Sequence, residues 1–218
     1  MINLEQQNEL FKVLGEKLKK RIECYVIGGS AMMYHGMKPS TKDIDLVFDH
    51  EKDREEVEKI LKNIGYKERE TRVIYFGKKN TPLLLQRDEA RFDLFLNKII
   101  STVLSEGMKE RVELIYEYDD LIVKVISPED IIITKCATER AGDRKDAAEI
   151  IEKVTIKWDQ VIEESIYQAS VTPYIFPVFL FDFLEELKED LKAEIPKKIL
   201  DEIRKIGEDM MEEKLKKK

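Results

Sequence analysis

Apolar residues in the first half of the chain fall into two kinds of pattern. Repeats at helical spacing predict amphipathic helices over residues 3–20 and 51–63. Short apolar runs bounded by polar residues or glycine predict strands, and these runs occupy residues 22–27, 43–48, 73–76, 83–86 and 92–96. Because helices interrupt the strands, we predict a sheet of the α/β or α+β class.

The middle of the chain is expected to contain one more helix and a hairpin. Residues 99–110 carry a helical pattern. Two β-rich runs follow at 112–118 and 121–126, and Asp119 and Asp120 between them are typical turn residues. We therefore predict a hairpin that ends the sheet-forming part of the chain.

Everything after the hairpin is predicted to be helical. Ser127 supplies a capping hydroxyl and Pro128 suits the first position of a helix, so a new helical region begins there. The predicted helices are 129–140, 143–154, 158–169, 173–191 and 197–215. We expect two domains, an α/β domain over residues 1–126 and a helical C-terminal domain over residues 127–218.

Composition indicates a globular protein that does not enter a membrane. Hydrophobic residues make up 43% and charged residues 38% of the 218 positions, and no apolar run reaches the length of a membrane span. The N-terminal segment is too polar for a signal peptide, so we expect a cytoplasmic protein. The two cysteines lack metal-site spacing and are expected to be small buried residues. The abundance of Lys and Glu over Asn and Gln points to a thermophile.

The distribution of charge restricts the partners that we expect. Residues 126–218 hold 16 Lys and Arg against 22 Asp and Glu, which leaves 22 and 23 for residues 1–125. The net charges are therefore −6 and −1, within a total of −7. A surface that tracks along nucleic acid usually gives a strongly positive balance, so extended nucleic-acid binding is disfavoured, whereas a local basic patch stays open.

The most informative stretch runs from the first strand to the second. Twelve residues separate Gly28, Gly29 and Ser30 from the sequence Asp43-Ile44-Asp45-Leu46. In an extended strand Asp43 and Asp45 project from the same face, so their carboxylates lie side by side. Buried carboxylates need a counter-charge, and oxygen ligands of this kind suit Mg²⁺.

The glycine turn supplies the complementary half of a site. Gly28 and Gly29 allow the backbone to come close to a ligand. A helix that opens at Ser30 would direct free N–H groups and its positive end toward an anion. Phosphate on one side and metal on the other together describe a nucleotide.

This pair of motifs resembles the signature of the nucleotidyltransferase superfamily related to DNA polymerase β, over roughly residues 22–150. The resemblance implies a mixed-sheet nucleotidyltransferase core with a C-terminal helical region. It also implies a third acidic residue on a later strand, and Asp93 is the one acid in the apolar run Arg91 to Leu96. Asp93 is thus the expected third catalytic carboxylate and metal ligand; the alternative is an edge-strand Asp paired with Arg91 or Lys98.

A later segment is similar to nucleotidyltransferases of the abortive-infection toxin type. There a helix start is followed by a Lys and then by an acid that opens the next helix. The similarity implies that Lys135 contacts phosphate and that Asp146 is the acid near the nucleotide, with Asp143 as the competing candidate. The alternatives are that Lys135 extends from a helix edge to solvent and that Asp143 is only a helix cap.

The resemblance implies an enzyme that uses two Mg²⁺ ions to move a nucleoside monophosphate from a nucleoside triphosphate to a protein or RNA hydroxyl. A toxin-type enzyme would have a cognate antitoxin. Two other functions stay open: a nucleotide-binding module without catalysis, and a kinase that transfers the γ-phosphate. The apolar segment 174–184 is expected to be a buried helix or, alternatively, a surface that binds a partner or forms a homodimer.

Overall fold

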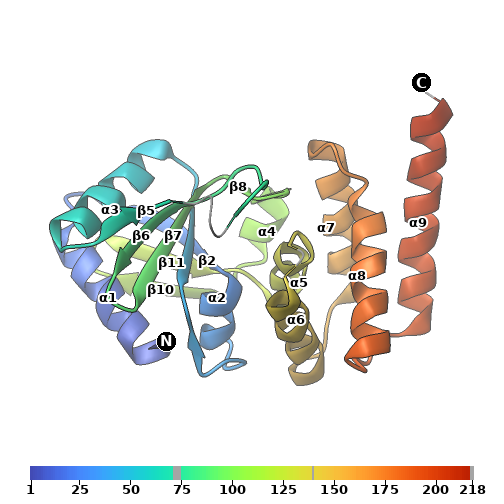
Figure 1. Cartoon of the computed structure of the whole chain (residues 1–218), viewed down its shortest axis with the longest axis horizontal. Helices are drawn as coiled ribbons and strands as arrows, with labels where there is room; N and C mark the ends of the chain where they lie inside the picture. Colours follow the sequence, from blue (N-terminus) through green and yellow to red (C-terminus); the bar gives the residue numbers. More distant parts are fainter. Residues whose placement is uncertain (71–74, 139, 217–218) are drawn as a thin grey trace. The chain divides into compact units, whose positions relative to one another are not determined.

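The structure is a computed structural model of the whole chain, and it describes residues 1–70, 75–138 and 140–216 (Figure 1). The chain forms two compact units. The first comprises residues 1–100 and 104–127, and the second comprises residues 101–103 and 128–218. Whether these units are the folding domains expected at 1–126 and 127–218 stays a prediction.

The centre of the first unit is a mixed sheet in the order β10-β11-β2-β4-β7-β6-β5. Its strands are β2 (Ile22–Ile27), β4 (Ile44–Phe48), β5 (Lys67–Arg69), β6 (Leu83–Arg87), β7 (Ala90–Leu96), β10 (Leu114–Tyr118) and β11 (Leu121–Val125). The pairs β11–β2 and β4–β7 are parallel, and the other neighbours are antiparallel. The predicted α/β class with a mixed sheet is confirmed.

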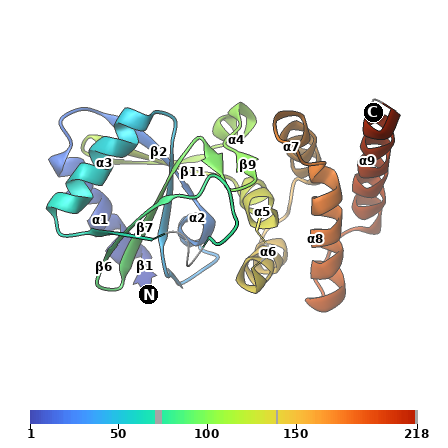
Figure 2. The ribbon, with the colours of Figure 1, turned by 45° about the horizontal axis from the view of Figure 1, so that its top comes forward.

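Helices α1 (Leu4–Lys17) and α3 (Glu51–Asn63) pack together against the sheet, as Figures 1 and 2 show. Each has one apolar stripe, and burial of that stripe against the strands stabilises the unit. The buried side chains are Phe11 and Leu14 on α1 and Val57, Ile60 and Leu61 on α3. The short helix α2 (Gly28–Tyr34) follows β2 directly and contacts β2 and β4. The sheet therefore holds the end of β2 and the start of β4 in fixed positions.

Several local predictions were wrong. Residues 99–110 do not form one helix: β8 (Lys98–Ile99) and β9 (Thr102–Val103) come first, and only α4 (Glu106–Glu110) is helical. Ile100 has a φ of +56°, which a helix cannot contain, and the Ser105 hydroxyl caps the shorter helix through the Met108 N–H at 3.0 Å. Residues 73 and 74 of the predicted strand 73–76 lie outside the described residues, and its last two residues form a turn.

Two short strands that the apolar pattern does not reveal complete the first unit. Strand β1 (Ile2–Asn3) pairs antiparallel with β3 (Ser40–Thr41). This pairing fixes the segment just ahead of the acidic strand β4. Cys24 is buried in this unit and Cys136 in the other; burial raises the pKa of both thiols, as expected for small core residues.

The second unit contains helices α5 to α9. Their bounds are α5 (Pro128–Cys136), α6 (Ala141–Lys153), α7 (Trp158–Val171), α8 (Phe176–Asp190) and α9 (Lys197–Lys216). Helix α8 packs on α7 and α9, and it buries Phe176, Leu180, Phe183 and Leu184. The apolar segment 174–184 therefore contributes to the core of this unit, and a homodimer through the helices stays a prediction.

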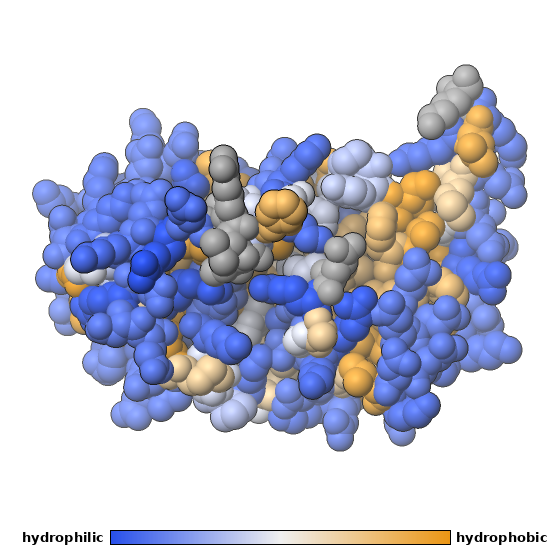
Figure 3. Space-filling model, in the orientation of Figure 1, coloured by the Kyte–Doolittle hydropathy of each residue, from blue (hydrophilic) through white to orange (hydrophobic). Residues whose placement is uncertain are grey.

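Apolar surface gathers over parts of α8 and α9, while most of the visible surface is hydrophilic (Figure 3). The exposed apolar side chains near these helices include Val171, Tyr174, Phe179, Met211 and Leu215. Within residues 1–70, 75–138 and 140–216, the helices are all too short or too polar to cross a membrane.

Candidate active site

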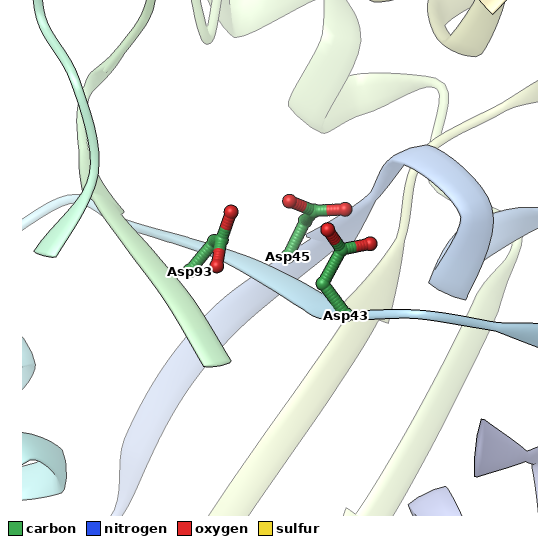
Figure 4. A group of neighbouring side chains, drawn as sticks. All are labelled: Asp43, Asp45 and Asp93. Atoms are coloured by element: carbon green, nitrogen blue, oxygen red, sulfur yellow. The ribbon is translucent and has the colours of Figure 1, made fainter. Parts of the chain in front are cut away.

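Three carboxylates converge at the neighbouring strands β4 and β7. Asp45 and Asp93 are direct partners in the parallel register, so their side chains leave the same face of the sheet side by side. Asp43 lies two residues before Asp45 and points the same way (Figure 4). Ligand oxygens of all three lie within 4.8 Å of one another. Asp93 is fully buried, whereas Asp43 and Asp45 are half-buried, so the cluster opens to solvent on their side.

Arg91 neutralises part of this acidic cluster. It precedes Asp93 by two residues on β7 and therefore shares its face of the sheet. Its Nε donates to Asp93 Oδ1 at 2.7 Å, and its Nη2 donates to Asp93 Oδ2 at 3.2 Å and also to Asp43 Oδ2. The pairing of Asp93 with Arg91, which the sequence left as an alternative, is present and coexists with the carboxylate cluster, but β7 lies between β4 and β6 and is not an edge strand.

Tyr75 completes the surroundings of Asp93. Its hydroxyl donates to Asp93 Oδ2 at 2.8 Å, and its side chain is buried. The buried carboxylate thus has a charged donor in Arg91 and a neutral donor in Tyr75. These contacts compensate for the loss of water and hold the carboxylate in one orientation.

The donor set fits a hard divalent cation. Such ions take carboxylate oxygens as ligands, and three residues here offer one within 4.8 Å of the others. Arg91 donates to oxygens of two of these three residues, Asp43 and Asp93. A cation bound by these two carboxylates would therefore compete with the Arg91 guanidinium for the same negative charge.

The glycine turn lies directly against the acidic cluster. Gly28 has a φ of +61°, and a Cβ on it would come within 2.7 Å of Asp45 Oδ2. A Cβ on Gly29 would come within 2.5 Å of Thr41 Oγ1 and 3.7 Å of Lys38 Nζ. Gly28 therefore requires glycine, because a side chain there would push the backbone away from the Asp45 carboxylate, whereas a side chain on Gly29 would clash with Thr41. Lys38, a cation beside the turn, is a residue that the sequence reasoning missed.

Ser30 is directed into the fold. Its side chain is fully buried, and its hydroxyl donates to Gln7 Oε1 at 2.7 Å and to the Asp43 carbonyl oxygen at 3.2 Å. Ser30 thus links α1 and α2 to the residue that begins the acidic segment. A contact between this hydroxyl and phosphate stays a prediction, and it would require the hydroxyl to leave Gln7. Gln7 was missed, although a polar residue on the core-facing side of an amphipathic helix was a usable signal.

Lys135 and Asp146 lie in the second unit and contact each other. The Lys135 ammonium donates to Asp143 Oδ1 at 2.7 Å and to Asp146 Oδ2 at 2.6 Å, so both acids that competed in the sequence pair with the same lysine. Asp143 also accepts from Arg140 Nε at 2.8 Å and from the Thr138 hydroxyl. Lys135 is buried and does not extend to solvent, and the cap of α6 is Arg140 rather than Asp143.

Burial and neighbouring charges have opposite effects on the pKa values of Lys135 and Asp143. Burial alone would lower the pKa of Lys135, but the Asp143 and Asp146 carboxylates raise it above 10.5. Burial alone would raise the pKa of Asp143, but the Lys135 and Arg140 charges lower it below 3.8. Asp143 therefore stabilises the fold above its ordinary pKa, and this contribution disappears as the pH falls through the lowered pKa.

We predict that Asp143→Asn lowers the free energy of unfolding by about 3 kcal/mol at neutral pH, because it leaves Lys135 buried with one carboxylate fewer. The difference between variant and wild type should shrink below about pH 4, where the wild-type carboxyl begins to lose its advantage. Urea denaturation followed by circular dichroism across this range measures both effects. Asp201→Asn, at an exposed position on α9, is the matched control, and a similar loss in the control would contradict the prediction.

The chain is similar to known nucleotidyltransferases in sequence and in fold. The model of a family described as "Nucleotidyltransferase of unknown function (DUF6036)" matches residues 3–174. A crystal structure of ANT(2'')-Ia in complex with adenylyl-2''-tobramycin is 15% identical, with a TM-score of 0.48, over 84% of this chain and 98% of that one. A solution structure of the antibiotic-resistance factor ANT(2'')-Ia is 16% identical, with a TM-score of 0.45, over 85% and 94%.

A third solved structure is an antigenic nucleotidyltransferase-like protein from Paracoccidioides brasiliensis. It is 17% identical, with a TM-score of 0.45, over 89% of this chain and 95% of that one. The search of curated proteins gave no match. The family match covers the sheet, the carboxylate cluster and helices α5 to α7.

Proposed function

The chain belongs to this nucleotidyltransferase family, and from this premise we propose that it transfers a nucleoside monophosphate from a nucleoside triphosphate to a hydroxyl of a protein or an RNA, with Mg²⁺ as the metal. The observation that supports the proposal most strongly is the convergence of Asp43, Asp45 and Asp93 beside the Gly28-Gly29 turn. The turn offers backbone N–H groups to phosphate, and the carboxylates offer oxygens to metal.

The site residues of the first unit have distinct roles in this proposal. Asp43 and Asp45 would hold both metal ions, and Asp93 would hold the one on the side of the acceptor. When bound, the ions neutralise the triphosphate and lower the pKa of the acceptor hydroxyl. Backbone N–H groups at Gly28 and Gly29 would donate to the phosphate oxygens, and Lys38 adds positive charge beside this turn.

The bond changes follow from this arrangement. The acceptor oxygen forms a bond to the α-phosphorus as the bond from that phosphorus to the α–β bridging oxygen breaks. The leaving group is pyrophosphate, and the hydroxyl proton passes to solvent. The residues contribute through positioning and charge neutralisation, because phosphoryl transfer requires little covalent chemistry from the protein.

Lys135 and Asp146 stay predicted nucleotide contacts on the strength of the sequence resemblance. Lys135 already donates to two carboxylates, so a phosphate contact would add to or replace one of these hydrogen bonds. The cognate antitoxin likewise rests on the resemblance to toxin-type enzymes. Growth arrest on expression, relieved by a neighbouring gene product, would support it, and normal growth at high expression would count against it.

The identity of the leaving group tests the proposed reaction. We expect label from an α-³²P nucleoside triphosphate to enter the acceptor fraction and pyrophosphate to accumulate in equal amount. Transfer of γ-³²P with release of nucleoside diphosphate would instead establish a kinase, which is the second reaction open to this site. Tight nucleotide binding without Mg²⁺ and without either product, measured by titration calorimetry, would establish a binding module.

A further inference from the structure

We propose that residues 75–80, here called the 75–80 loop, bind the acceptor, and that the acceptor is the end of a single-stranded nucleic acid. In this proposal the Phe76 ring stacks on a base, and Lys79, with Lys78 beside it, contacts the phosphate backbone. The inference rests on the proposed function for its acceptor hydroxyl, but its binding test requires no catalysis.

Hydrogen bonds anchor the 75–80 loop at both ends. At its start the Tyr75 hydroxyl donates to Asp93 Oδ2 at 2.8 Å. At its end the Asn80 side-chain amide donates to the Ile100 carbonyl oxygen at 2.7 Å. Between them, the Lys78 N–H donates to the Tyr75 carbonyl oxygen at 3.0 Å and closes a turn around Gly77, whose φ is +71°. The loop thus has a defined shape, and its first residue contacts the acidic cluster.

Phe76 projects its ring into solvent from this anchored turn. It is 87% exposed, more than any other large apolar residue in the described part of the chain, whereas the preceding Tyr75 is 6% exposed. A single exposed apolar residue is ordinary by itself. What distinguishes Phe76 is its position one residue from the side chain that holds Asp93. A ring there is available to a ligand at the acceptor side of the cluster, the side assigned to Asp93 above.

The charge around the loop identifies the chemistry of that ligand. Residues 75–87 contain no Asp or Glu, and Lys78 and Lys79 are the charged residues of the loop itself, in a chain whose net charge is −7. The Lys79 side chain is exposed and Lys78 is half-buried. A positively charged segment that also carries an exposed aromatic ring is the combination that binds single-stranded nucleic acid, through phosphate contacts and base stacking. A polycationic small-molecule acceptor would require acidic residues at this place.

Fluorescence anisotropy with a short fluorescein-labelled single-stranded RNA, in the absence of nucleoside triphosphate, tests the proposal on the full chain. We expect Phe76→Leu to weaken binding about tenfold, because leucine keeps apolar surface but cannot stack on a base. Phe76→Tyr should restore most of the affinity. Lys79→Gln should reduce the slope of log K against log salt by about 0.7, which corresponds to one lost phosphate contact.

Two matched controls separate the loop from general effects. Phe179→Leu removes another exposed ring, which is 50% exposed on α8, and Lys59→Gln removes an exposed lysine on α3. Neither should change RNA affinity or its salt dependence. Equal RNA binding by wild type, Phe76→Leu and Lys79→Gln would overturn the inference, as would efficient labelling of a protein acceptor by Phe76→Leu at the wild-type rate.

Titration calorimetry with a nucleoside triphosphate and Mg²⁺ distinguishes failure of the inference from failure of the proposed function. Loss of triphosphate binding in Phe76→Leu, with RNA binding retained, would show that the ring holds the donor base and would overturn the acceptor assignment. Absence of pyrophosphate release by the wild type with every acceptor would refute the proposed function, whatever the RNA measurements give.

Discussion

Asp45→Asn should reduce nucleotidyl transfer by about 10³-fold or more, because metal-ion catalysis contributes several kcal/mol and each 1.4 kcal/mol corresponds to about a factor of ten. Asp45 lies between the other two carboxylates: it is the register partner of Asp93 and two residues from Asp43. One of its oxygens also faces the glycine turn, where a Cβ on Gly28 would touch it. Loss of its charge would therefore affect metal and triphosphate together.

The measurement is pyrophosphate release at saturating nucleoside triphosphate and Mg²⁺, together with thermal unfolding of each protein. Asparagine has the shape of aspartate, so the variant should unfold near the wild-type temperature. Asp88→Asn is the matched control, because Asp88 is exposed in the turn between β6 and β7 and asparagine tolerates its φ of +52°. Wild-type rates in Asp45→Asn, with the metal still required, would remove Asp45 from the mechanism.

Local pattern was sufficient to predict the parts of the site that depend on neighbouring residues in sequence. Alternation in an extended chain predicts that Asp43, one residue before β4, and Asp45 share one face. The glycine pair between a strand and a helix indicates a turn whose backbone can come close to a ligand. The match of a nucleotidyltransferase family model to residues 3–174 confirms the resemblance that these motifs indicated, while the catalytic roles of individual residues stay predictions.

Contacts between distant residues could not be predicted from the chain alone. The parallel register that brings Asp93 opposite Asp45 joins two strands with α3, β5 and β6 between them in sequence. Tyr75 contacts Asp93 and Gln7 contacts Ser30 only because the fold brings together segments that are distant in sequence. The sequence suggested a phosphate contact for Lys135, or alternatively a solvent-exposed helix edge, and gave no sign that the folded unit buries it between two carboxylates that α6 supplies.

The helix predicted over residues 99–110 failed for a related reason. Short apolar runs in strands and helices share the same spacing over a few residues, so periodicity alone does not distinguish them. The left-handed backbone at Ile100 is held from outside the run, by hydrogen bonds between Asn80 and the Ile100 backbone. A β-branched residue adopts that conformation only when its surroundings determine it.

Arg91→Gln should lower the free energy of unfolding of the metal-free protein by about 3 kcal/mol, because it removes the counter-charge of a buried carboxylate. Asp93 is fully buried, and the Arg91 side chain is 18% exposed, so solvent screens this pair weakly. Without the guanidinium, three carboxylates with ligand oxygens within 4.8 Å would repel one another. A divalent cation then becomes the best remaining source of positive charge.

Metal ions should therefore stabilise Arg91→Gln more than they stabilise the wild type. In the wild type the cation must displace Arg91 from Asp43 and Asp93, whereas in the variant this competition is removed. Thermal unfolding with increasing Mg²⁺ or Mn²⁺ measures the difference, since a ligand that binds only the folded state raises Tm with its concentration.

Arg87→Gln provides the control for Arg91→Gln, because Arg87 lies on the neighbouring strand β6 and stacks over Tyr66 away from the carboxylates. Arg87→Gln should lower the metal-free stability by less than Arg91→Gln does. It should also leave the increase of Tm with metal as it is in the wild type. An equal increase of Tm with metal in wild type and Arg91→Gln would mean that the guanidinium and the cation occupy separate places. In that case Arg91 would stay in contact with Asp93 during the reaction, and its charge would be available to the phosphate.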